Sequence, residues 1–322
     1  MKKINIGRHI VILILIVLWG IMFILNDSFR TGANLGSILR EASSTGIAAL
    51  GMTFIIIMGD FDLSIGSMLA LIGMIMAGSM DSMGLIPALV FGCAAGLICG
   101  LVNGIIISYF HVPAFITTLG TYYSFRALAY IFNNANTIIC TESAFLKMGT
   151  GSAAGIPIPF LVFLVLAAAG GVVLNRTTYG RNVRALGNSE KACQISGIDT
   201  RKVRCIAFVL MGFCTAVSAV IVTARQACAS PDVAANFHFD AITMVVLGGT
   251  KMTGGEGSIL NTVIAAILYA SVSNCLNLYH VDAQWQRVCM GLILLAAFSF
   301  DFIQKTVGRT RKNVQKKAAE SM

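Results

Sequence analysis

Three carboxylates stand at the edges of long apolar runs, at Asp60, Asp62 and Asp240. An ionised carboxylate at membrane depth is costly, and where one persists it commonly serves an ion, a proton or a solute. Asp62 and Ser64 also have the side chains that cap helices, and an apolar run begins just after them at Ile65. We predict that this loop reaches the water surface and that one of the two residues caps the helix. A direct role in a solute pathway is the alternative.

Several further polar residues lie within apolar runs. Arg126 has no acidic residue nearby in the sequence, so its guanidinium either extends to the membrane surface or lines a hydrated path, and both alternatives stay open. The three asparagines of these runs are expected to form hydrogen bonds between helices, with contacts to solute hydroxyls as the alternative. The candidates for a solute pathway are Asp62, Ser64, Asn103, Thr117, Thr118, Tyr122, Arg126, Asn274 and Asn277.

The sequence contains no residue set typical of an enzyme, a metal site or a cofactor site. The four histidines are far apart, and the nine cysteines include no Cys-x-x-Cys pair. The glycine-rich stretch 248–255 lacks the Gly-Lys-Ser/Thr ending of a phosphate-binding loop. We therefore expect no catalysis, metal or cofactor in this chain. Any transport would draw its energy from a partner or from an ion gradient.

The elements that position these residues are predicted to be transmembrane helices. Only 11% of the 322 residues are charged and 57% are hydrophobic, whereas a soluble domain has about 25% charged residues. We predict a single all-α transmembrane bundle over residues 1–322, with about 8–10 membrane segments. The candidate segments are roughly 10–25, 45–59, 66–80, 85–109, 113–132, 157–175, 204–224, 240–250, 258–278 and 287–304.

Two of these segments, 45–59 and 240–250, are short for a full crossing. Each ends in glycine, continues into a short charged loop and resumes at a Gly-Ser pair, which begins at Gly66 or Gly257. Paired interruptions in the two halves of an apolar chain are typical of transporters built from repeats. An internal repeat with short or broken helices, and a chance likeness between glycine-rich loops, both stay open.

Four glycines recur at every fourth position of the run 85–109, at Gly92, Gly96, Gly100 and Gly104. On a helix they share one face, and a neighbouring helix can approach this face closely because side chains are absent from it. We predict a helix-packing face, with a groove that lines a pore as the alternative.

Positive charge is concentrated in three places. The net charge is +9, and basic residues gather before the first span, at 176–204, and in a tail at about 305–322. Because cytoplasmic segments of membrane proteins are enriched in Lys and Arg, we expect all three in the cytoplasm, with an even number of crossings. This distribution argues against a nucleic-acid partner.

A series of short motifs extends from about Leu50 to Asp301. In order they are Asp62 to Ser67, Pro113 to Gly120, Arg126, Gly180-Arg181-Asn182, Ala185 to Asn188, Ser196-Gly197-Ile198, Asp240-Ala241-Ile242, Val246 to Thr250, Gly254-Gly255 and Gly257-Ser258. Their order and combination resemble the ribose and autoinducer-2 permease family of bacterial ABC sugar importers. The chain departs from that family at Asp60, where glycine is common, and at Tyr122-Tyr123, so the resemblance implies no particular sugar.

The resemblance implies a permease that carries a monosaccharide or related small polar solute across the bacterial inner membrane. ATP would be hydrolysed in separate ABC ATP-binding subunits, and solute would arrive from a periplasmic or lipid-anchored sugar-binding protein. A second permease copy or close homologue, and membrane lipid, complete the expected partners. The alternative is an ion-coupled secondary transporter, for which Asp60, Asp62 and Asp240 are the candidate ion ligands.

The family places its ATPase-coupling helix where this chain has the connection 178–204. We expect a short amphipathic helix around Ser189–Gly197, which would lie in a cleft of the ATPase and pass on its closure. A solvated basic loop that only sets the topology is the alternative. The matching residues, and hence the coupling candidates, are Gly180, Arg181, Ala185, Gly187, Asn188, Ser196, Gly197 and Ile198.

Overall fold

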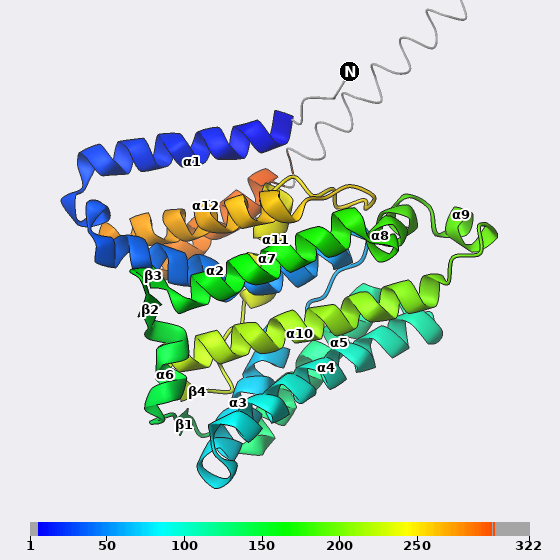
Figure 1. Cartoon of the computed structure of the whole chain (residues 1–322), viewed down its shortest axis with the longest axis horizontal. Helices are drawn as coiled ribbons and strands as arrows, with labels where there is room; N and C mark the ends of the chain where they lie inside the picture. The colour runs from blue at the N-terminus through cyan, green and yellow to red at the C-terminus, as the bar shows by residue number, and fades with distance from the viewer. Residues whose placement is uncertain (1–5, 298, 300–322) are drawn as a thin grey trace, which may run out of the picture.

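A computed structural model describes residues 6–297 and 299 of the chain. These residues form the predicted all-α bundle (Figure 1). Five of the described helices, α3, α4, α7, α10 and α12, are long and apolar enough to cross a membrane. The elements are α1 (Ile6–Leu25), η1 (Asp27–Arg30), α2 (Gly32–Ile57), α3 (Ile65–Met83), α4 (Leu85–Tyr109), α5 (Ala114–Phe132), α6 (Ser143–Thr150), α7 (Ile158–Arg176), α8 (Thr178–Asn188), α9 (Glu190–Ile195), α10 (Thr200–Gln226), α11 (Phe237–Leu247) and α12 (Ile259–Leu278).

The two ends of the bundle differ in character. Figure 1 shows α8 and α9 at one end, which we call the α9 end, and α6 with the short strands at the opposite end, the α6 end. At the α6 end, β1 (Ile138–Ile139) pairs antiparallel with β4 (Cys228–Ala229), and β2 (Ser152–Ala153) pairs with β3 (Ile156–Pro157). The β1–β4 pair therefore ties the segment after α5 to the segment after α10.

A further helical stretch follows α12, from 283 to 297. It covers the beginning of the predicted segment 287–304. The rest of that segment, apart from residue 299, and the predicted basic tail at 305–322 lie outside the described residues.

The central element of the bundle is α2. All residues from Ala42 to Ile57 are buried, because α7, α10, α11 and α12 all pack against this helix. The prediction of a short segment at 45–59 is wrong. The helix begins at Gly32 and has 26 residues, or about 39 Å, which exceeds a hydrocarbon core of about 30 Å. Polar residues in its first half concealed this length.

Three hydroxyls of α2 are satisfied within the helix itself. Ser43, Ser44 and Thr53 each donate to the backbone carbonyl four residues earlier, at 2.6, 2.9 and 2.7 Å. Thr53 also pairs with Thr262 of α12 at 2.9 Å between the hydroxyl oxygens. Because such bonds need no neighbouring helix, these residues are compatible with an apolar interior.

The second predicted short segment is short in the structure. α11 has 11 residues, about 16 Å, or roughly half the thickness of the hydrocarbon core. It nevertheless ends as α2 does. Gly59 and Gly249 follow the two helices with φ values of 87° and 81°. In both places the next amide donates to the carbonyl five residues before it, at 3.1 and 3.3 Å, which is a common way to end a helix at glycine.

The glycine stripe of α4 lies against two neighbouring helices. A Cβ atom added at Gly100 would lie 2.4 Å from the Phe208 carbonyl oxygen of α10, and one at Gly96 would lie 2.7 Å from the Gly212 oxygen. One at Gly92 would meet Met76 of α3 at 3.3 Å, and the fourth glycine, Gly104, faces the α10 backbone at 3.0 Å. The absence of side chains thus allows the backbones of α4 and α10 to touch.

Candidate functional site

The connection between α7 and α10 is largely helical. α8 begins after Thr177, whose hydroxyl accepts a bond from the amide of Gly180 at 3.2 Å. α9 begins after Ser189, whose hydroxyl accepts from the amide of Ala192 at 3.2 Å. Both serve as N-caps and satisfy amides that a helix start leaves unpaired. α9 falls within the helix expected around Ser189–Gly197.

Two coupling candidates of α8 touch the membrane bundle through their backbones. Gly180 and Gly187 are seven residues apart, so they share one face of the helix. A Cβ atom at Gly180 would lie 2.2 Å from the Leu174 oxygen at the end of α7. One at Gly187 would lie 1.8 Å from the Ile57 oxygen at the end of α2 and 2.4 Å from the Gly255 nitrogen. Only glycine fits at either position without a backbone shift.

Gly187 therefore lies where two distant segments meet. The amide of Gly255 donates to the Ile57 oxygen at 2.8 Å, which joins the loop after α11 to the end of α2. Asn188 lies beside the same loop, since a Cβ at Gly255 would approach its Oδ1 atom at 2.3 Å. The side-chain nitrogen Nδ2 of Asn188 donates to the backbone oxygen of Arg184 at 3.0 Å. The end of α8 thus fills the junction between α2 and the loop.

Arg184 holds α8 to the end of α7 and to the loop after α11. Its guanidinium donates to the Leu174 oxygen at 3.1 Å and to Asn175 Oδ1 at 2.7 Å, both at the end of α7. It also reaches the Gly257 oxygen at 3.5 Å. Arg184 was counted in the sequence only as one of many basic residues, and the sequence gives no sign of these acceptors.

α9 presents most of its surface to the outside. Cys193 is buried, whereas Ile195 is 82% exposed although it is strongly apolar. Ser196 and Gly197 follow in an exposed turn with a φ of 75° at Gly197. The amide of Ile198 then donates to the Cys193 oxygen at 3.0 Å and closes the turn. The other coupling candidates, Arg181 and Ala185, are exposed and partly buried respectively.

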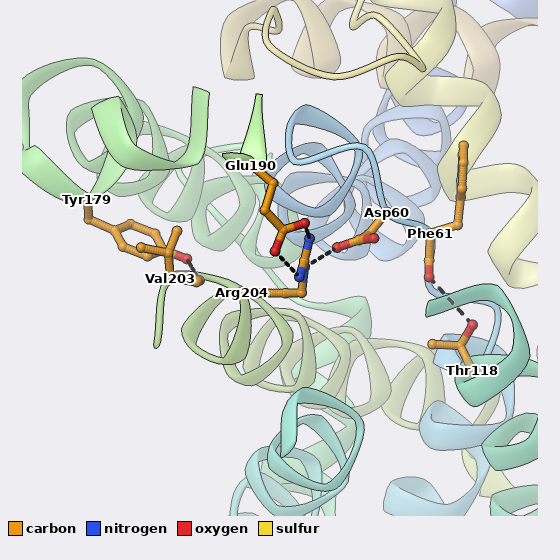
Figure 2. A network of polar contacts seen from close by, with 7 residues as sticks. All are labelled: Asp60, Phe61, Thr118, Tyr179, Glu190, Val203 and Arg204. Atoms are coloured by element: carbon orange, nitrogen blue, oxygen red, sulfur yellow. Dashed lines mark hydrogen bonds and ion pairs between the residues drawn. The ribbon is translucent and has the colours of Figure 1, made fainter. Parts of the chain in front are cut away.

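A cluster of three charged residues joins α9, α10 and the α2–α3 loop, which comprises residues 58–64 (Figure 2). Arg204 donates through Nε to Asp60 Oδ2 at 2.8 Å. Its two terminal nitrogens bind the two carboxylate oxygens of Glu190 at 3.1 and 3.0 Å. Burial raises the pKa of the Asp60 carboxyl, and the Arg204 guanidinium opposes this rise. Asp60 thus has a specific partner 144 positions away.

Asp62 and Ser64 lie in the interior of the protein, so the prediction that places these two side chains at the water surface is wrong, although Gly59 of the same loop is exposed. Both side chains, and that of Asn103, are fully buried. Asp62 Oδ1 accepts bonds from the Ser64 amide at 2.8 Å and from its hydroxyl at 2.6 Å, and Asn103 donates to the same hydroxyl at 2.9 Å. Ser64 is the N-cap residue of α3 by position, but its side chain makes no capping bond. These contacts fix the turn before α3 to α4.

Two pathway candidates of α5, Tyr122 and Arg126, contact α11 and the segment that leads into it. Arg126 donates to the carbonyl oxygens of Pro231 and Val233, the latter at 2.8 Å, and its guanidinium lies 5.8 Å from the centre of the Tyr122 ring. The Tyr122 ring in turn meets His238 of α11 edge to face at 5.5 Å. The guanidinium therefore anchors non-helical backbone, a role that neither sequence alternative included.

The two threonines of α5 differ in their contacts. The Thr118 hydroxyl donates within its own helix to the Ala114 oxygen at 2.8 Å and also lies 3.5 Å from the Phe61 oxygen of the α2–α3 loop. The Thr117 hydroxyl is buried and has no hydrogen-bond partner among the residues that the structure describes. Thr118 thus links α5 to the loop that carries Asp60.

The remaining candidates bind other side chains. Asn274 and Asn34 exchange two amide bonds at 2.8 and 3.0 Å, which joins α12 to α2. Asn277 is exposed at the end of α12 and accepts a bond from Gln286 at 2.8 Å. Asp240, in the first turn of α11, accepts a bond from the Tyr269 hydroxyl at 2.5 Å.

Residues 34–298 match the family model described as the permease component of branched-chain amino acid transport systems. The chain belongs to this permease family. It is 35% identical to the ribose import permease protein of Haemophilus influenzae, over 92% of this chain and 95% of the relative. It is 36% identical to that of Bacillus subtilis, over 92% of each chain, and 33% identical to the L-arabinose transport system permease protein of Escherichia coli, over 92% of each. No solved structure matches.

The family predicted from the motifs is therefore confirmed, and nothing in these comparisons supports the ion-coupled alternative. Sequence reasoning missed three residues that hold the α9 end of the permease together, namely Arg184, Glu190 and Arg204. Of the contacts that these residues make, the sequence draws attention only to Asp60, the partner of Arg204, because it is a charged residue between two apolar runs.

Proposed function

We propose that this permease is the transmembrane subunit of an ABC importer that carries a monosaccharide into the cytoplasm, driven by ATP hydrolysis in a partner subunit. The observation that carries the proposal is the alignment, over about nine-tenths of the chain, with permeases named for ribose, L-arabinose and D-allose. All three sugars are small, uncharged and rich in hydroxyl groups.

The ATP-binding subunit is proposed to dock on α8 and α9. α9 projects from the bundle, and its exposed Ile195 offers an apolar contact among exposed basic residues. α8 is held to α2, α7 and the loop after α11 through Gly187 and Arg184. A push on α9 and α8 would therefore reach several membrane helices as a rigid-body movement.

The orientation and the other partners follow from the same proposal. The α9 end carries the basic stretch 176–204, so the positive-inside tendency puts it in the cytoplasm, with both termini on that side of the inner membrane. A periplasmic or lipid-anchored sugar-binding protein would deliver solute to the α6 end. A second copy of the permease, or a close homologue, would complete the pathway in a membrane-embedded dimer.

The experiment that tests this function is co-purification of the tagged permease from native membranes, followed by mass spectrometry and sugar uptake in proteoliposomes. We expect an ABC ATPase in the eluate, and ATP-dependent uptake of an aldose such as ribose, arabinose or allose. Ile195→Glu should reduce the retained ATPase, and Gln194→Glu, which adds the same charge at a neighbouring exposed position, serves as the control. A preparation that imports sugar with no ATPase present would refute the proposal.

A further inference from the structure

The α2–α3 loop makes three separate sets of contacts within seven residues. Its first part binds Arg204 of α10 through Asp60. Its middle part meets α5, where the Phe61 oxygen lies 3.5 Å from the Thr118 hydroxyl. Its last part is fixed to α4 through Ser64 and leads directly into α3. Figure 2 shows Asp60 and Glu190 on either side of Arg204, with the Phe61–Thr118 contact beyond Asp60.

The charged cluster is partly removed from water. The side chains of Arg204 and Asp60 are 15% and 17% exposed, whereas Glu190 is 42% exposed. Arg204 binds Glu190 with both terminal nitrogens, an arrangement that fixes direction as well as distance. Removal of one partner from a pair with this little exposure leaves a charge in poorly solvated surroundings, so the cluster strongly favours a single geometry.

The neighbouring contact of α8 reinforces this geometry. The Tyr179 hydroxyl of α8 donates to the Val203 oxygen at 3.2 Å, immediately before Arg204 in the chain (Figure 2). The first turn of α10 is therefore held by α8 on one side and by α9 and the loop on the other. A displacement of α9 cannot leave the position of Asp60 unchanged unless the bonds of Arg204 break.

We propose that Arg204 is a positioning residue for import, and that the Asp60–Arg204–Glu190 cluster passes a displacement of α9 to the α2–α3 loop and so to α3 and α5. This inference rests on the proposed function, since it supposes that an ATPase moves α9. The loop transmits the displacement at two points, the Phe61–Thr118 contact and the turn at Ser64 that begins α3. The pathway candidates of α5, including Tyr122 and Arg126, would then move with the state of the ATPase.

The test is the number of ATP molecules hydrolysed per sugar imported, measured in proteoliposomes that contain the permease with its ATPase and binding protein. Asp60→Asn, Glu190→Gln and Arg204→Gln should each raise this ratio by roughly two- to thirtyfold, the range found for residues that couple distant sites. The Asp60→Asn/Glu190→Gln double variant should be no worse than the stronger single variant, because both changes interrupt one connection. Arg204→Lys, which keeps the charge, should restore part of the coupling.

Lys202→Gln provides the matched control. Lys202 lies in the same turn of α10 and forms an ion pair with Asp199 at 3.2 Å, but its side chain is 72% exposed. This variant should keep the wild-type ratio. Unchanged ratios in the three cluster variants would overturn the inference, and so would loss of bound ATPase at an unchanged ratio, because the cluster would then only brace the docking site. A wild-type protein that imports no sugar would instead count against the proposed function, which separates the two failures.

Discussion

Gly187→Ala is the substitution for which the structure gives the clearest expected cost. The new methyl carbon would lie 1.8 Å from the Ile57 oxygen, whereas real Cβ atoms essentially never approach a heavy atom within 3.0 Å. The α8 backbone at residue 187 and the Ile57 oxygen would therefore have to move apart by at least 1.2 Å. The nearest atoms on both sides, Ile57 O and Gly255 N, belong to the backbone, so no side-chain rotation can supply it.

The expected loss of stability follows from three contributions. Overpacking of this kind costs about 1–3 kcal/mol. Loss of the 2.8 Å bond between the Gly255 amide and the Ile57 oxygen adds about 0.5–1.5 kcal/mol, and the better helix propensity of alanine recovers about 1 kcal/mol. The net loss of about 0.5–3.5 kcal/mol should leave the bundle folded and displace α8 from the junction. We therefore expect a modestly lower thermal midpoint, and a fall in ATP-dependent uptake that is greater than the loss of folded protein explains.

The assay compares thermal unfolding of the purified variant with its uptake in proteoliposomes. Gly171→Ala is the matched control, because Gly171 lies inside α7 and an added Cβ would meet no atom within 4 Å among the described residues beyond its chain neighbours and the nearby backbone of α7. That variant should be as stable as the wild type or slightly more so, with unchanged uptake. Wild-type stability and uptake in Gly187→Ala would refute the close backbone contact from which the reasoning starts.

Three further predictions concern other parts of the permease. Asp62→Asn should retain most uptake, because an amide oxygen can still accept the two bonds of the turn before α3; complete loss of uptake would show that the carboxylate acts directly in the pathway. Asn274→Leu should lower the free energy of unfolding by about 1–3 kcal/mol, and with it the thermal midpoint, because the Asn34 amide loses its partner. Asn34→Leu added to it should recover part of that loss, since no unpaired amide is then left, and additive losses would argue against the exchanged pair. Gly197→Val should reduce uptake more than membrane insertion, because a β-branched residue disfavours a φ of 75°; normal uptake measured beside normal insertion would contradict a coupling role for this turn.

The helices of the bundle could largely be predicted from hydrophobic runs, because each run has to match the thickness of the membrane. α2 is the exception, because its length could not be predicted from its hydropathy. The residues around Ser43 and Ser44 look too polar for a span, but hydropathy describes a helix in contact with lipid, and α2 is enclosed by protein. Its hydroxyls are also satisfied locally, which no measure of average polarity detects.

The site could be predicted only in part, for a related reason. The glycines of α8 and α4 mark positions where a side chain does not fit, so they could be noticed in the sequence as residues. Their partners could not, since Gly187 meets Ile57 and Gly100 meets Phe208 across long stretches of chain. The same holds for Asp60 and Arg204, whose pairing depends on how α10 returns past the end of α2.

The central position of α2 has a consequence for how the protein is made. The ribosome produces α2 before α7, α10, α11 and α12, the helices that later enclose it. During that interval it has to lie in the bilayer or at the insertion machinery without its final neighbours. The internal bonds of Ser43, Ser44 and Thr53 make this early exposure tolerable, because the hydroxyls have acceptors as soon as the helix forms. The order of synthesis thus requires a helix that is largely enclosed by protein in the finished permease to lie first in lipid without these neighbours.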